Sequence, residues 1–175
     1  MRNKIVLFLT ILISFVLQCT LFQSLAIGSI AANLTLILVI SMALTRGSNT
    51  AMFCGFFSGL LWDLMSGGYL GVYALFYLLI GYLAGLTYRI YYDNNSKVPM
   101  ILVALADFIL NTGVYLIDFF LQGNTGYLYY VRRIIIPEMI YTVAVCAIVY
   151  RIFYWISHTL MTEERKEGNY NWLLK

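Results

Sequence analysis

Residues 55–75 read G-F-F-S-G-L-L-W-D-L-M-S-G-G-Y-L-G-V-Y-A-L. Three glycines and one aspartate recur in this stretch at spacings of four: Gly55, Gly59, Asp63 and Gly67. On a helix, residues at this spacing lie along one slowly rotating stripe. Glycines so placed allow a second helix backbone to approach closely, and a carboxylate in hydrocarbon costs about 2.5–3.5 kcal/mol unless it faces protein or water. We therefore predict a membrane helix built for contact, followed by a glycine-rich turn and a further helix.

The composition points to the same environment. Of the 175 residues, 62% are hydrophobic and 11% are charged, and the mean hydropathy is +0.82. These values exclude an ordinary soluble domain. A chain of this length holds about six membrane helices of ~20 residues each. We therefore predict an all-α multi-pass membrane protein that does not bind nucleic acid.

Polar breaks divide the chain into apolar segments. They predict six transmembrane helices at residues 5–23, 27–44, 50–65, 70–88, 99–121 and 134–156. The first run is too long for a secretory signal and lacks a small-residue cleavage site. The prediction is thus a membrane domain over residues 1–157, with a polar cytoplasmic tail over residues 158–175.

The basic residues predict the orientation. If both termini are cytoplasmic, nine of the eleven Lys and Arg residues fall on the cytoplasmic side, and only Arg132 and Arg133 fall outside. Cytoplasmic loops of membrane proteins carry the excess of Lys and Arg. The chain is therefore predicted to lie in the bacterial cytoplasmic membrane with both ends inside the cell.

Further polar residues lie inside or at the edge of the predicted bundle: Asp107, Asn111, Asp118, Arg132, Arg133 and Glu138. The first three share one face of the fifth helix, because they are spaced by four and seven. The other three meet Asp118 on the external side, where a cluster of opposite charges is expected. These acids either pair and fix the helix register or serve another role, and the sequence leaves both interpretations open.

A second glycine pair, Gly81 and Gly85, lies on the fourth predicted helix. Both glycine pairs suit packing within the chain or contact with a partner's helix. For Asp63, a role in partner contact or in correct assembly is favoured.

The sequence offers no catalytic or metal-binding set. Its single histidine, His158, lies at the cytoplasmic end, and Ser58 does not stand in a G-x-S-x-G context. Asp63 and Asp107 lie on separate helices, outside the G-x-G-D context of an aspartyl dyad. The three cysteines have no metal-like spacing. We predict no enzymatic activity, no cofactor and no metal.

An ordered set of short motifs runs along the chain: Asn33-Leu34, Arg46-Gly47, Gly55-x-x-x-Gly59-Leu60-x-x-Asp63 with Gly67, Leu70-Gly71, Tyr73-Ala74-Leu75, Gly81-x-x-x-Gly85, and Arg133-x-x-x-Pro137-Glu138-x-x-Tyr141. In this set the chain resembles the MreD family, the rod-shape-determining membrane proteins of bacterial cell elongation. The resemblance spans the first to the sixth predicted helix.

The resemblance implies a non-enzymatic membrane subunit of the rod complex, or elongasome. Such a subunit would bind MreC and work with MreB, RodA and a penicillin-binding transpeptidase in cell-shape maintenance and peptidoglycan synthesis. The resemblance also implies a six-helix fold similar to the substrate-binding S components of energy-coupling-factor transporters.

Two alternatives stay open. Beside the MreD interpretation, the chain could be a true S component for vitamin uptake or a membrane protein of another pathway. S components dock through small-x-x-x-small pairs on their first helix, where this chain offers only Thr10 and Ser14.

Overall fold

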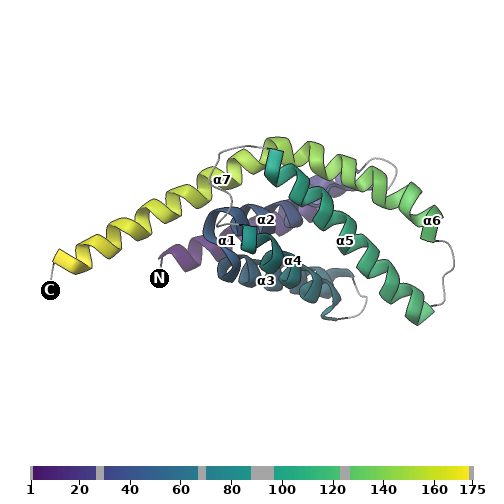
Figure 1. Cartoon of the computed structure of the whole chain (residues 1–175), viewed down its shortest axis with the longest axis horizontal. Helices are drawn as coiled ribbons and strands as arrows, with labels where there is room; N and C mark the ends of the chain where they lie inside the picture. The colour runs from purple at the N-terminus through teal and green to yellow at the C-terminus, as the bar shows by residue number, and fades with distance from the viewer. Residues whose placement is uncertain (1, 27–29, 67–69, 88–96, 123–126, 174–175) are drawn as a thin grey trace.

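The computed structural model describes residues 2–26, 30–66, 70–87, 97–122 and 127–173, and these residues form helices and no strands (Figure 1). The helices are α1 Arg2–Leu17, the π-helix η1 Gln18–Phe22, α2 Leu34–Arg46, α3 Ser48–Ser66, α4 Val72–Leu86, α5 Lys97–Gln122, α6 Tyr127–Tyr130, the π-helix η3 Val131–Ile135 and α7 Ile136–Leu173. The all-α prediction is therefore confirmed.

Three stretches of these helices are long and apolar enough to cross a membrane: Ile5–Phe22, Val98–Phe119 and Tyr127–Phe153. The helices α2 and α4 are apolar but shorter. The chain is thus a helical membrane protein with three long apolar helices around shorter ones.

Helix α2 lies at the centre of the bundle. Every residue from Leu34 to Thr45 is buried, and α2 packs against α1, α3, α4, α5 and α7 (Figure 1). Its 13 residues span only about 20 Å, less than the ~30 Å of hydrocarbon in a bilayer. A helix shorter than the hydrocarbon layer is tolerated here because protein, not lipid, surrounds it.

The start of α2 corrects the predicted range 27–44. The helix begins at Leu34, and residues 30–33 before it are not helical. Residues 27–29 lie outside the described part of the chain. Asn33 caps the helix with its side chain, and a capping side chain favours a helix start even within an apolar run.

Helices α3 and α4 form a tight antiparallel hairpin in which glycines of α3 meet the backbone of α4. A Cβ added at Gly55 would lie 2.3 Å from the carbonyl oxygen of Tyr77, and one at Gly59 would lie 2.5 Å from the Cα of Ala74. Both distances are too short for real atoms. Only glycine therefore fits these two positions without separating the helices.

The glycines of α4 make the reciprocal contact with α3. A Cβ at Gly81 would lie 2.7 Å from the carbonyl oxygen of Ala51, and one at Gly85 would lie 2.3 Å from the Cα of Ser48. The structure thus places both predicted glycine pairs in packing within the chain.

The last helical stretch is longer than predicted. It runs without a break from Tyr127 through η3 and α7 to Leu173, whereas the sequence predicted a helix over 134–156 and a polar tail after it. Arg132 and Arg133 lie within η3 and not in a loop. Pro137 has no backbone N–H and therefore cannot donate a helical hydrogen bond. The π-helix η3, in which the hydrogen-bond pattern departs from that of an α-helix, ends at Ile135, just before this proline.

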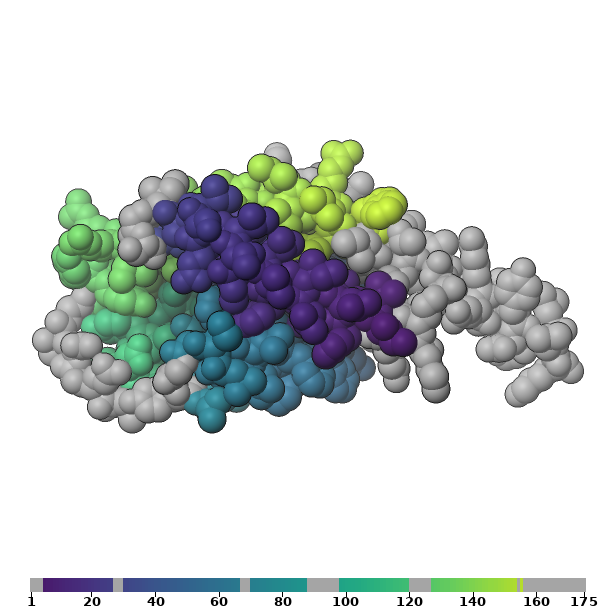
Figure 2. All heavy atoms as spheres, turned by 180° about the vertical axis from the view of Figure 1, so that it is seen from behind, coloured from purple at the N-terminus to yellow at the C-terminus, as the bar shows by residue number. Residues whose placement is uncertain are grey.

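The outer surface of the bundle is apolar. Figure 2 shows one face, on which α1 runs between α7 and the α3–α4 hairpin. Large exposed side chains on α1 include Phe8, Leu12 and Ile13. Such a surface suits contact with lipid.

We expect Gly55→Ala to lower the free energy of unfolding by about 1–3 kcal/mol, because the new methyl group meets fixed backbone of α4. The matched control is Gly113→Ala in α5, where the three atoms nearest to the Cβ all belong to the ring of Phe76, a side chain that can turn aside. Thermal unfolding of the purified protein in detergent measures both. Equal midpoints for the two variants would contradict close packing at Gly55.

Candidate functional site

Asp63, near the end of α3, caps the start of α4. Its side chain is 1% exposed, and its Oδ1 accepts a hydrogen bond from the backbone N–H of Tyr73 at 3.0 Å. Its Oδ2 accepts from the N–H groups of Gly71 and Ala74, each at 3.0 Å. These donors have no partner within the helix, and the positive end of the helix dipole favours a carboxylate there.

Two glycines of the predicted motifs, Gly67 and Gly71, lie in the chain between Asp63 and α4. Gly71 precedes α4 with a φ of 98°, a left-handed conformation that glycine adopts readily. Gly67, the last member of the predicted stripe, lies outside the described residues. The structure thus places Asp63 inside the chain and not on its outer surface.

A second buried cap lies at the start of α2. The Oδ1 of Asn33 accepts hydrogen bonds from the N–H of Leu36 at 3.0 Å and from the hydroxyl of Tyr77 at 2.9 Å. The N–H of Asn33 donates to the Oγ1 of Thr142 at 3.2 Å. One residue therefore connects α2 with α4 and α7.

Gln18, in η1, completes this second cap. Its Nε2 donates to the carbonyl of Ala32 at 2.9 Å, and its Oε1 accepts from the N–H of Leu34 at 2.6 Å. Gln18, Tyr77 and Thr142 are not among the predicted site residues. The sequence could have indicated them, because each is a polar side chain within an apolar helix.

On α5, the predicted polar stripe divides into buried and half-buried members. Asp107 is fully buried, and neither of its carboxyl oxygens has a hydrogen-bond partner in the described part of the chain. The Nδ2 of Asn111 donates to the backbone carbonyl of Asp107 at 3.1 Å, and the Asn111 side chain lies near Glu138 of α7. Asp118 is only half-buried. The buried part of the stripe therefore faces α7.

The predicted cluster of opposite charges does not form. Arg132 and Arg133 are exposed, and Arg133 donates to the hydroxyl of Tyr129, with its guanidinium 5.5 Å from the centre of that ring. Among side chains that the structure describes, no ion pair joins these arginines to Asp118 or Glu138. The physical reason is direction, because Glu138 faces inward to Asn111 while the arginines face outward.

A polar cavity of about 260 Å³ lies where η1, α3, α4, α5 and the last helical stretch meet. Its walls include Trp62, Tyr73, Asn111, Tyr130 and Glu138. The cavity thus brings one predicted site residue of α5 and one of α7 together with aromatic side chains that the sequence analysis did not single out.

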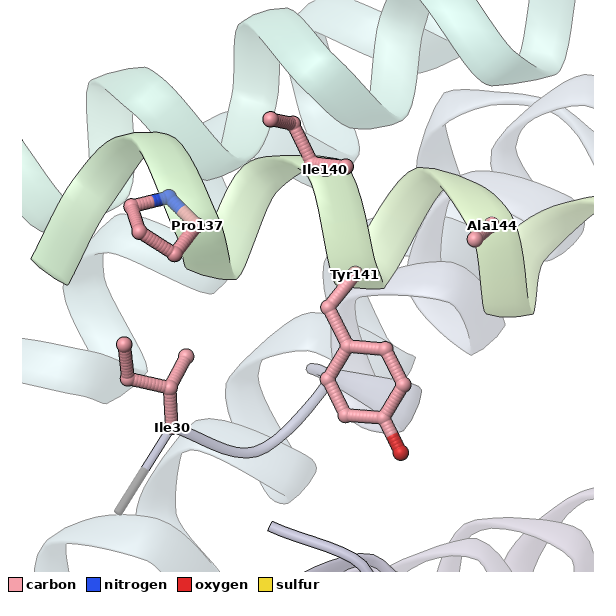
Figure 3. Close-up of a pocket in the computed structure, with 5 residues that line it drawn as sticks. All are labelled: Ile30, Pro137, Ile140, Tyr141 and Ala144. Atoms are coloured by element: carbon pink, nitrogen blue, oxygen red, sulfur yellow. The ribbon is translucent and has the colours of Figure 1, made fainter. Parts of the chain in front are cut away.

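An apolar groove of about 410 Å³ lies on another face of α7. It is lined by Ile30, Pro137, Ile140, Tyr141 and Ala144 (Figure 3). In the close-up, Ile30 lies opposite Pro137, and Tyr141 projects from α7 toward the segment before α2. The hydroxyl of Tyr141 donates to the carbonyl of Leu25 at 3.3 Å, which ties α7 to the end of the α1 region.

The described residues show a structural role for Ser58 and no metal-ligand cluster. Ser58 is buried, and its hydroxyl donates to the backbone carbonyl of Cys54 in the preceding turn. In the same part of the chain, no three His, Cys, Asp or Glu side chains gather where a metal ion could bind.

In a comparison with protein families, the family described as rod shape-determining protein MreD matches residues 1–159. The chain belongs to the MreD family. It is thus a rod-shape-determining membrane protein, of a family of shape-determining structural proteins. Neither the curated proteins nor the solved structures gave a match, so the implied likeness to S components has no support from these comparisons.

We expect Asp63→Asn to destabilise the protein by about 1–3 kcal/mol. An amide offers one oxygen where the carboxylate uses two, so at least one N–H of α4 would face an NH₂ group. Asp118→Asn is the control, since this half-buried acid accepts no such bonds from the described residues, and its effect should stay within about 0.5 kcal/mol. Thermal unfolding midpoints in detergent compare the two, and an unchanged midpoint for Asp63→Asn would refute the capping role.

Proposed function

We propose that the protein is a non-enzymatic subunit of the cell-elongation complex, or elongasome, in the bacterial cytoplasmic membrane. In this role it binds MreC and acts with MreB, RodA and a penicillin-binding transpeptidase in cell-shape maintenance and peptidoglycan synthesis. The observation that carries the proposal is the family match over residues 1–159. The inward placement of Asp63 and of the buried hydroxyl of Ser58 is consistent with a structural role for these groups.

We further propose that both termini are cytoplasmic. The division of basic residues, nine against two, supports this orientation. The fold is consistent with it, because the start of α1 and the end of α7 extend toward the same end of the bundle, while α6 lies at the other (Figure 1). Arg132 and Arg133 then lie on the external side.

The partner's membrane helix needs a face that the chain does not use itself. The glycine stripes of α3 and α4 are occupied by each other, so they are closed to a partner. The apolar groove at Ile30 and Pro137 is concave and outward-facing, and Arg133 lies one turn before Pro137 on the same helix. We assign the docking of the MreC membrane helix to this groove.

The test is co-purification of MreC from gently solubilised native membranes. Ile140→Trp fills the groove and should reduce the recovered MreC at least severalfold. The matched control is Ile101→Trp on α5, because Ile101 is 60% exposed and Ile140 is 62% exposed, but Ile101 does not line the groove. The control should recover MreC as the wild type does.

The outcomes separate the two parts of the proposal. Equal recovery of MreC with both variants would overturn the groove assignment alone. Failure of the wild type to recover MreC, or recovery of paired ATPases with a coupling subunit in its place, would overturn the proposed function and favour a transporter module.

A further inference from the structure

The polar cavity contains a carboxyl group with no described cation among the residues that line it. Among the described residues that line it, Glu138 is the one carboxylic acid, and none is Lys, Arg or His. The neutral amide of Asn111 lies near its carboxyl group. A second acid, Asp107, lies one turn before Asn111 on α5 and is fully buried. A positive charge would complement an ionised Glu138 carboxylate in these walls.

Aromatic rings form much of the remaining wall. Trp62 and Tyr73 stack with their ring centres 6.1 Å apart, and Tyr130 contributes a third ring. The faces of such rings attract ammonium groups, and the attraction strengthens where water is excluded. A carboxylate beside several aromatic rings is the chemistry that recognises an organic ammonium ion, and the volume of about 260 Å³ suits a small one.

The indole of Trp62 gives an independent indication. Its Nε1 is buried and has no hydrogen-bond partner in the described part of the chain, although Trp62 lines the cavity. Buried donors in native proteins are nearly always paired, so an unpaired one calls for an acceptor. A ligand that carries an oxygen close to its ammonium group would supply that acceptor.

We propose that the polar cavity is a binding site for a small alkylammonium group with a neighbouring oxygen, as in ethanolamine and choline. Glu138 holds the ammonium charge, Trp62, Tyr73 and Tyr130 surround it, and the Nε1 of Trp62 donates to the oxygen. This chemistry is shared by free amino alcohols and by the headgroups of zwitterionic phospholipids. The site goes beyond the proposed function and does not depend on the binding of MreC.

The fluorescence of Trp62 reports on the cavity directly. In the full chain with Trp155→Phe and Trp172→Phe, Trp62 is the only tryptophan. This protein is placed in nanodiscs of phosphatidylglycerol and titrated with choline chloride or ethanolamine hydrochloride at constant ionic strength. In a second arm, the nanodiscs contain phosphatidylethanolamine. A saturable change with the free cations identifies a soluble ligand, and a change only with phosphatidylethanolamine identifies a lipid headgroup.

Two pairs of variants test the assignment. Glu138→Gln keeps the shape but removes the charge, and should weaken binding at least about tenfold, whereas Asp118→Asn should bind as the parent does. Tyr130→Leu removes one ring of the wall and should also weaken binding, whereas Tyr129→Leu alters a neighbouring ring that does not line the cavity. The absence of a response to every probe, or equal binding by Glu138→Gln and its parent, would overturn the proposal.

Discussion

The backbone N–H groups at the starts of the buried helices impose the constraint on which the rest of the structure depends. A helix leaves its first N–H groups unpaired, and inside a membrane bundle no bulk water is present to bond them. Asp63 of α3 supplies the acceptors for α4, and Gln18 of η1 supplies one for α2. Because each of these acceptors belongs to a different helix, each cap also fixes the position of one helix against another.

The cap of α4 and the glycine contacts select the same register. The Asp63 carboxylate bonds the N–H of Ala74, and one turn earlier on α3 Gly59 lies against the backbone of the same residue. One turn further from the cap, Gly55 lies against the backbone of Tyr77. A shift of α4 along α3 would break the hydrogen bonds to the Asp63 carboxylate. The same shift would place side chains between the two helix backbones. Electrostatics and packing therefore cooperate over the whole length of the hairpin.

Much of this could be predicted from the sequence. Its apolar runs predicted the helical segments, and the glycine spacing predicted close helix contacts, because both depend on local pattern. Which groups meet in each contact depends on tertiary structure and not on local pattern. The sequence therefore predicted for Asp63 only a role in partner contact or assembly, and it predicted no role for Gln18 or Thr142. The predicted helix start before Leu34 was wrong because the prediction followed hydropathy, which does not show that Asn33 caps the helix. The charge cluster was wrong because proximity along the chain does not set the direction in which Glu138 and Arg133 face.

The polar pattern of this chain is directed inward. The glycine and aspartate stripe that most resembles a binding motif instead packs and bonds within the α3–α4 hairpin. Against this background of satisfied helix starts, the carboxyl oxygens of Asp107 and the Nε1 of Trp62 have no hydrogen-bond partner among the described residues, as is also true of the Oγ1 of Thr35 in α2. Natural proteins depart from complete hydrogen bonding mainly at functional sites. The region between α3, α5 and α7 is therefore where the requirements of folding alone do not account for the residues present.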